Sequence, residues 1–185
     1  ARRPGLRVRV HATPDSLRAS TCGAGWALSC YDGVLHVVAQ PGPLGEALSR
    51  SVRHESLHAQ LDALSPLAPR WFHEGLAQRF ADEPFARERV AGEAATWLPL
   101  AELSAALGLS QDGEIAGRAY RQARFAVELA VERGGPEVLV RAVEALRGGL
   151  PAERFAEGLR LTDAQLRAAP RVDQQALNAV MTNYQ

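Results

Sequence analysis

The chain lacks lysine altogether, since all 21 basic residues among its 185 are arginine. Because alanine, leucine and glycine are also abundant, we attribute this to the coding bias of a GC-rich genome and not to function. The arginines are balanced by 21 acidic residues, so the formal net charge is zero. That balance gives no indication of a nucleic-acid partner or an anionic membrane surface. No apolar run is long enough for a membrane span, which needs about 18 residues.

The chain begins at Ala1, with neither an initiator methionine nor a recognisable signal peptide. We therefore expect a processed form or a segment of a longer protein. Hydrophobic residues make up 46% and charged residues 23% of the sequence, which is ordinary for a soluble globular protein. At this length we expect a single domain over residues 1–185 with a substantial hydrophobic core.

Cysteine is scarce, with only Cys22 and Cys30 in the Gly-rich segment STCGAGWALSCYDG. If the two pair, the small loop they close stabilises the fold by roughly 2–3 kcal/mol. A disulfide would indicate a location outside a reducing cytosol. The alternative is two buried free thiols, which behave as small hydrophobic side chains. Their spacing does not suit a zinc site, and no further His or Cys lies close enough in sequence.

Strand patterns are confined to the N-terminal part. Residues 6–10 alternate, and we expect Leu6, Val8 and Val10 to form the buried face of a strand. Thr13 precedes Pro14 as the N-cap of a short helix. A second strand is predicted in residues 32–39, opened by the turn pair Asp32-Gly33.

Helical periodicity dominates after residue 43. A long helical pattern ends at the prolines of SPLAP, and RWFHEGLAQRFA predicts a second helix. Further helices follow to the end of the chain. The sequence therefore predicts an α+β fold, mostly α: a β-rich part (1–42), a helix pair (43–83) and a helical C-terminal part (84–185).

The segment VRHESLHAQ places His54 and His58 four positions apart, with Glu55 directly after the first. On an α-helix, residues at this spacing share one face, so the two imidazoles can bind one zinc ion. Glu55 is rotated by about 100°, beside the metal, where it can accept a proton from water. The alternative is an exposed helix face that carries two histidines.

A third ligand is available in PRWFHEGLAQ, on the second predicted helix. Helices joined by a short loop pack antiparallel, so Glu74 can face the two histidines. Gly75 would let the two helix backbones approach closely. His73 competes with Glu74, because imidazole is a common zinc ligand. The two side chains point about 100° apart on a helix, so only one can be aimed well at the metal.

The His-Glu-x-x-His and Trp-x-x-Glu-Gly-Leu-Ala pieces together resemble the peptidase MA-like family of bacterial gluzincin zinc metallopeptidases. The resemblance covers most of the chain, including TPDSLRAST, GAGWALSCYDGVLHV, AYRQARFAVEL and GGPEVLVRAVEALRGGLPAERFAEGL. It implies a zincin-like active-site helix and one Zn²⁺ per chain, bound by His54, His58 and Glu74. It also implies that Glu55 is the general base, and that His73 lies beside the cleft or at its rim.

Two further positions are weighed against the family. Tyr120 falls where such proteins often carry a tyrosine, and it would donate to the developing oxyanion, or else be a half-buried tyrosine on a helix. Gln78 falls where gluzincins often carry an acidic residue that supports a ligand, and an uncharged amide orients a histidine less strongly. Cys22 and Cys30 also depart from the family, whose members usually have small residues there.

The resemblance implies a peptidase that hydrolyses a peptide or protein substrate by zinc-activated water. The strand at 34–39 is predicted to form the cleft edge that pairs with extended substrate. His36 on this strand is expected in the core or on the surface, with cleft lining as the alternative. The competing functions are a zinc-binding domain with little or no turnover, used in peptide binding or regulation, and a purely structural helical domain.

The cysteine pair and the resemblance to exported proteins predict an extracytoplasmic location: periplasmic, secreted or surface-anchored. No feature of the sequence predicts an oligomeric state, a cleavage specificity, or endo- as against exopeptidase activity.

Overall fold

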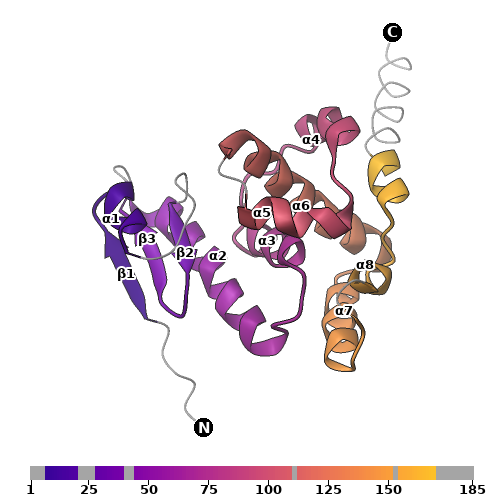
Figure 1. Ribbon diagram of the computed structural model, residues 1–185, viewed down its shortest axis with the longest axis horizontal. Coiled ribbons are helices and arrows are strands. Elements are labelled where there is room, and N and C mark those ends of the chain that lie inside the picture. The colour runs from indigo at the N-terminus through magenta and orange to yellow at the C-terminus, as the bar shows by residue number, and fades with distance from the viewer. Residues whose placement is uncertain (1–6, 21–27, 40–43, 110–111, 152–153, 170–185) are drawn as a thin grey trace.

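A computed structural model of the chain describes residues 7–20, 28–39, 44–109, 112–151 and 154–169. Three short strands and the short helix α1 lie at one end of the molecule, and the remaining helices form the rest (Figure 1). The elements are β1 (Val8–His11), α1 (Pro14–Arg18), β2 (Ser29–Tyr31), β3 (Leu35–Val38), α2 (Leu44–Leu64), α3 (Arg70–Phe80), α4 (Arg87–Glu93), η1 (Ala94–Thr96), α5 (Leu100–Leu109), α6 (Gly113–Gly134), α7 (Glu137–Arg147) and α8 (Phe155–Gly158), followed by a helical stretch at 163–169. The predicted α+β, mostly α class is confirmed.

The sheet has the order β1-β3-β2, with β1 parallel and β2 antiparallel to β3. Gly33, with φ of 99°, makes the tight turn between β2 and β3. Because β3 is paired on both sides, the prediction that this strand forms a cleft edge is wrong. The edge strand beside α2 is β2, which the sequence analysis did not predict as a strand.

The short helix α1 begins as expected. The Thr13 side chain accepts a hydrogen bond from the Ser16 amide in a capping box, and Pro14 occupies the first helical position. The predicted burial of one β1 face is wrong for two residues, since Val8 is 49% and Val10 59% exposed. The buried residue of β1 is His11.

Helix α2 runs from the sheet to the helical body, where α3 packs against both α2 and α6 (Figure 1). It ends before Pro66, and α3 starts directly after Pro69, as the prolines predicted. The helical body has an aromatic centre in which Phe72 and Phe155 are fully buried, with ring centroids 4.7 Å apart. This packing seats α3, which carries one of the expected metal ligands.

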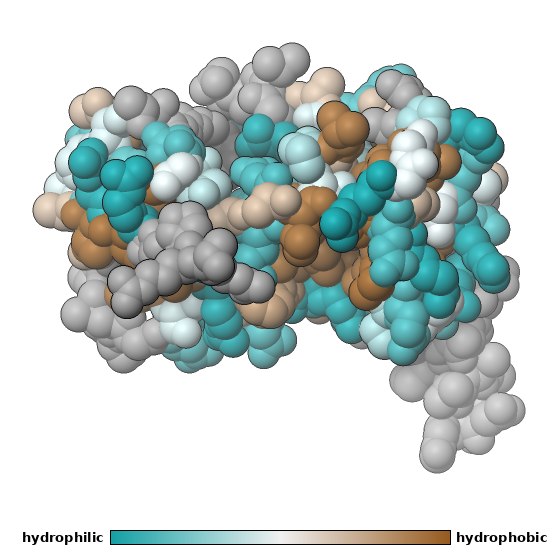
Figure 2. Space-filling view, turned by 90° about the horizontal axis from the view of Figure 1, so that it is seen from below, coloured by the Kyte–Doolittle hydropathy of each residue, from teal (hydrophilic) through white to brown (hydrophobic). Residues whose placement is uncertain are grey.

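The surface seen from below in Figure 2 is largely hydrophilic, with hydrophobic side chains gathered near its middle. Within the described residues, no helix combines the length and the apolar character needed to cross a bilayer.

Candidate metal site

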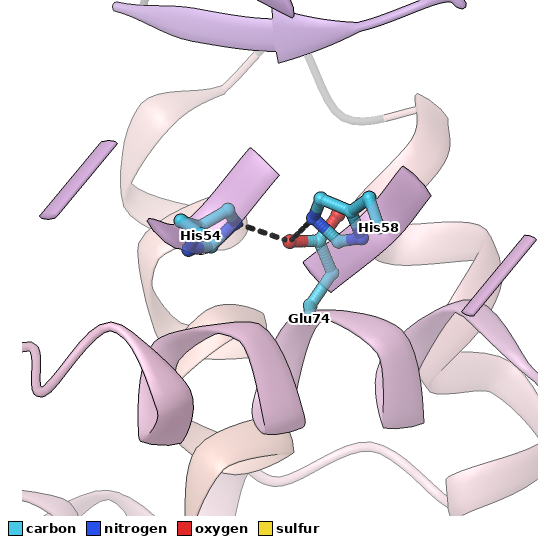
Figure 3. A group of neighbouring side chains, drawn as sticks. All are labelled: His54, His58 and Glu74. Atoms are coloured by element: carbon cyan, nitrogen blue, oxygen red, sulfur yellow. Dashed lines mark ion pairs between the residues drawn. The ribbon is translucent and has the colours of Figure 1, made fainter. Parts of the chain in front are cut away.

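The structure brings together the three side chains that the sequence predicted as ligands. His54 and His58 project from α2, and the Glu74 carboxylate from α3 lies between their rings (Figure 3). Glu74 Oε2 is 3.4 Å from Nε2 of His54 and 3.4 Å from Nε2 of His58. One ligand atom from each residue lies within 4.8 Å of the others, so the group could hold a metal ion.

The Glu74 carboxylate fits a metal ligand better than a structural acid. Its side chain is almost fully buried, and Oε2 has no hydrogen-bond partner although it is aimed at two imidazoles. Both imidazole nitrogens are close enough for an ion pair but beyond good hydrogen-bond distance, and a cation between the three side chains would satisfy this oxygen. Two imidazole nitrogens and one carboxylate oxygen suit zinc and several other divalent transition metals.

The pKa values of Glu74 and His54 are shifted so that a negatively charged carboxylate lies beside a positively charged imidazole. Burial acts to raise the pKa of Glu74, but its interactions with His54 and His58 outweigh burial and hold the pKa well below its usual value. Burial acts to lower the pKa of His54, but the carboxylates of Glu74 and Glu83 outweigh it and raise this pKa to about 10. Both shifts favour a protonated His54 beside an ionised Glu74, so a metal ion that binds here would displace a proton.

Glu83 is a residue that the sequence analysis missed. Its Oε1 lies 2.7 Å from His54 Nδ1, on the side of the ring away from Glu74. With Nδ1 bonded to a carboxylate, Nε2 of His54 is directed at the site. The only signal in the sequence was that an acidic residue, Glu83, follows closely after the helix that carries Glu74.

Glu55 lies beside the ligand group but is not a member of it. It is 4% exposed, and Oε1 accepts a 2.7 Å hydrogen bond from Ser29 Oγ on β2. Burial raises the pKa of Glu55, while the nearby His54 charge and the Ser29 bond lower it in part. The position beside the ligand group and the raised pKa suit a residue that accepts and returns a proton.

His73 is buried behind His58 and is not at a rim. The two rings stack with centroids 6.1 Å apart and an interplanar angle of 16°. Burial, followed by the His58 charge, lowers the pKa of His73. Glu74, and not His73, completes the group with His54 and His58.

Gln78 supports the backbone of a ligand and not its side chain. Its Nε2 donates to the carbonyl oxygens of Glu74 at 3.2 Å and Tyr120 at 2.9 Å. The amide therefore ties α3 to α6 next to the third ligand. The expected support of a histidine from position 78 is replaced by the Glu83 contact.

Tyr120 is half-buried on α6 and lies near the site. Burial raises the pKa of its hydroxyl, and the charges of Glu74 and Glu55 raise it further, whereas a hydrogen bond to Arg70 lowers it. Arg70, also missed by the sequence analysis, places Nε 3.5 Å from Glu74 Oε1. One guanidinium thus contacts both the expected ligand and the expected oxyanion donor.

Gly75 has a different neighbour from the one expected. A Cβ at this position would lie 2.3 Å from the Ala123 carbonyl oxygen and 2.9 Å from Val127 Cγ2. The close backbone approach is therefore between α3 and α6, not between the two ligand-bearing helices. This close approach fixes the position of α3 relative to α6, and therefore the position of Glu74.

His36 belongs to the sheet interior and not to the cleft. It is 2% exposed and hydrogen-bonded through Nδ1 to Nε2 of His11 at 2.9 Å. Cys30 lies on β2, whereas Cys22 falls outside the described residues, so the Cys22–Cys30 bridge stays a prediction.

Comparison with known proteins gives no relative: no protein-family model, no curated protein and no solved structure matches the chain.

Proposed function

We propose that the protein is a zinc-dependent peptidase of the gluzincin type, similar to the peptidase MA-like family. The observation that carries the proposal is the buried Glu74 Oε2, which lies 3.4 Å from the Nε2 atoms of both His54 and His58 without a hydrogen bond to either. A second carboxylate, Glu55, lies next to this group without joining it. Hydrolysis by an activated water molecule requires these two parts, a set of metal ligands and a base next to it.

His54, His58 and Glu74 would hold one zinc ion per chain. Bound there, zinc supplies a Lewis acid that polarises a peptide carbonyl and brings the pKa of a water molecule towards neutrality. The carboxylate of Glu74 lowers the net charge of the site from +2 to +1.

Glu55 moves the proton. Since Ser29 occupies Oε1, we assign the accepting role to Oε2 of Glu55. As the water oxygen bonds to the peptide carbon, Glu55 takes one water proton. It then delivers this proton to the departing nitrogen as the carbon–nitrogen bond breaks.

Tyr120 and β2 would handle the substrate. The Tyr120 hydroxyl, oriented by Arg70, would donate to the carbonyl oxygen as negative charge develops on it. The edge strand β2 carries Ser29 and lies beside α2, so an extended peptide added to it would pass Glu55. The substrate is therefore an extended peptide or protein segment.

The test begins with metal stoichiometry of matched variants. Elemental analysis of the purified protein should find one zinc per chain. Glu74→Ala should lose zinc, whereas the neighbouring His73→Ala should retain it. Zinc loss in His73→Ala with retention in Glu74→Ala would overturn the ligand assignment.

A peptide-library digest then tests turnover. Cleavage should occur with the zinc-loaded protein, stop with a chelator and return on adding zinc. Zinc binding without cleavage of any library member would favour the alternative, a metal-binding domain that binds peptides or regulates a partner.

An extracytoplasmic location is part of the proposal and rests on the Cys22–Cys30 bridge. Thiol titration of the unfolded, unreduced protein, matured under oxidising conditions, should find no free thiol. Two free thiols would remove the argument for that location.

A further inference from the structure

His54 contacts a second carboxylate besides that of Glu74, and this one belongs to Glu83, just after the end of α3. The pair is short, with Glu83 Oε1 2.7 Å from His54 Nδ1. The position one turn after Glu74, from which a helix could offer a supporting side chain, is filled by Gln78. Its amide is engaged with backbone oxygens of Glu74 and Tyr120.

The end of α3 has the geometry that aims Glu83 back at α2. The amide of Asp82 bonds to the Arg79 carbonyl at 3.2 Å, and the amide of Glu83 bonds to the Gln78 carbonyl at 3.1 Å. These two bonds define a Schellman motif, in which one residue adopts the left-handed conformation. Asp82 does so, with φ of 54°. The turn reverses the chain directly before Glu83.

The loop is also fixed beyond Glu83. The ring of Phe85 packs against the hydrophobic core, with its centroid 6.5 Å from that of Phe125 on α6. The Arg124 guanidinium lies over the same ring at 5.5 Å. Glu83 is thus held between a hydrogen-bonded helix end and an anchored aromatic residue.

We propose that Glu83 is the positioning residue of the metal site: it fixes the His54 ring so that Nε2 faces the metal, in place of a side chain at position 78. This inference rests on the proposed metal site but does not require peptidase activity. Its consequence is that the metal affinity of the protein depends on the turn at residues 81–83 as well as on the ligand helices.

The test compares Glu83→Gln with Asp82→Asn. Both remove one negative charge at neighbouring positions, and asparagine tolerates the left-handed conformation. Glu83→Gln should weaken zinc binding about 10- to 100-fold in a competition assay with a chromogenic chelator, as expected for loss of a ligand-orienting carboxylate. Asp82→Asn should stay within about twofold of the unaltered protein. Equal weakening by both variants, or none by Glu83→Gln, would overturn the proposal.

A second readout needs no metal. In the metal-free protein, Glu83→Gln should shift the imidazole ¹⁵N resonances of His54 more than those of the other histidines, whereas Asp82→Asn should not. Unchanged His54 resonances would contradict the positioning role. Zinc binding with the expected Glu83 effect, but without peptide hydrolysis, would remove the proposed peptidase function and leave this inference standing.

Discussion

The two sides of the candidate metal site are built differently. On the helical side, Glu74 lies on α3, which is pressed against α6 at Gly75 and surrounded by buried aromatic rings. On the sheet side, Glu55 is bonded to Ser29, on a three-residue edge strand. The hydrophobic core that encloses α3 does not include the buried residues of the sheet, such as Leu35 and Val37.

This difference separates two requirements of the proposed chemistry. A metal ligand must keep its position to within a fraction of an ångström, and dense helix packing provides that. A general base must have a suitable pKa, which depends on burial and on a few polar neighbours. The helical side would therefore set metal geometry, and the sheet side would set the pH range of the reaction.

The largest effect is expected from Glu55. Glu55→Gln removes the proton acceptor but keeps the shape of the side chain, so peptide hydrolysis should fall by about 10²- to 10⁴-fold. Zinc should remain at one per chain, measured by elemental analysis. A metal-free Glu55→Gln protein would make Glu55 a ligand or a determinant of the fold.

Gly75→Ala tests the packed side. The added methyl group would meet the Ala123 backbone, which cannot move aside easily, so the variant should lose about 1–3 kcal/mol of stability or more. Thermal unfolding measures this loss, at about 2–4 °C per kcal/mol. Gly92→Ala on α4 is the control, because its Cβ would meet nothing within 4 Å. Equal melting temperatures for the two variants would show that α3 is not seated as described.

The pH dependence of the metal-free protein follows from His54. Its pKa is about 10 when folded against 6.5 ordinarily, so the stability it contributes is complete below about pH 6.5 and is lost as pH rises towards 10. The melting temperature should fall by several degrees over that window, and His54→Gln should lack this component. With zinc bound the proton is displaced, so zinc affinity should rise with pH over the same range. A zinc affinity that does not change between pH 6.5 and 10 would contradict the raised pKa of His54 beside Glu74.

The smallest effect is expected from Ser29. Its hydrogen bond lowers the pKa of Glu55, so Ser29→Ala should raise that pKa and move the acidic limb of the rate–pH profile to higher pH. The maximal rate should change less than about tenfold, and zinc content should not change. Ser29→Thr keeps the hydroxyl and should behave like the unaltered protein. A loss of zinc in Ser29→Ala would show that the sheet side also holds the ligands.

The grouping of His54, His58 and Glu74 was predictable because it follows largely from local rules. The spacing of His54 and His58 fixes a common helix face, and the prolines between α2 and α3 fix where the second helix begins. Thr13 and Pro14 likewise identified the start of α1.

What the sequence did not predict depends on contacts between distant segments. Ser29 reaches Glu55 only because β2 pairs with β3 beside α2, and a three-residue strand in a Gly-rich segment gives almost no pattern. Glu83 reaches His54 from the turn that follows α3. Arg70, by contrast, is one helical turn before Glu74 on α3, so this contact followed a local rule that the sequence analysis did not apply. The partner of Gly75 is Ala123, and no local rule connects α3 to a helix so far along the chain.

The contact between α3 and α6 also bears on the order in which parts of the protein fold. All three candidate ligands lie between residues 54 and 74, so they leave the ribosome before α6 does. The hydrogen bond from Gln78 to Tyr120, however, spans 42 positions, and Gly75 docks against Ala123 in the same helix. A nascent chain that ends before α6 carries every ligand but lacks the surface that seats Glu74. The candidate site is therefore complete only once α6 has docked, and we expect any metal to be captured after that non-local contact has formed.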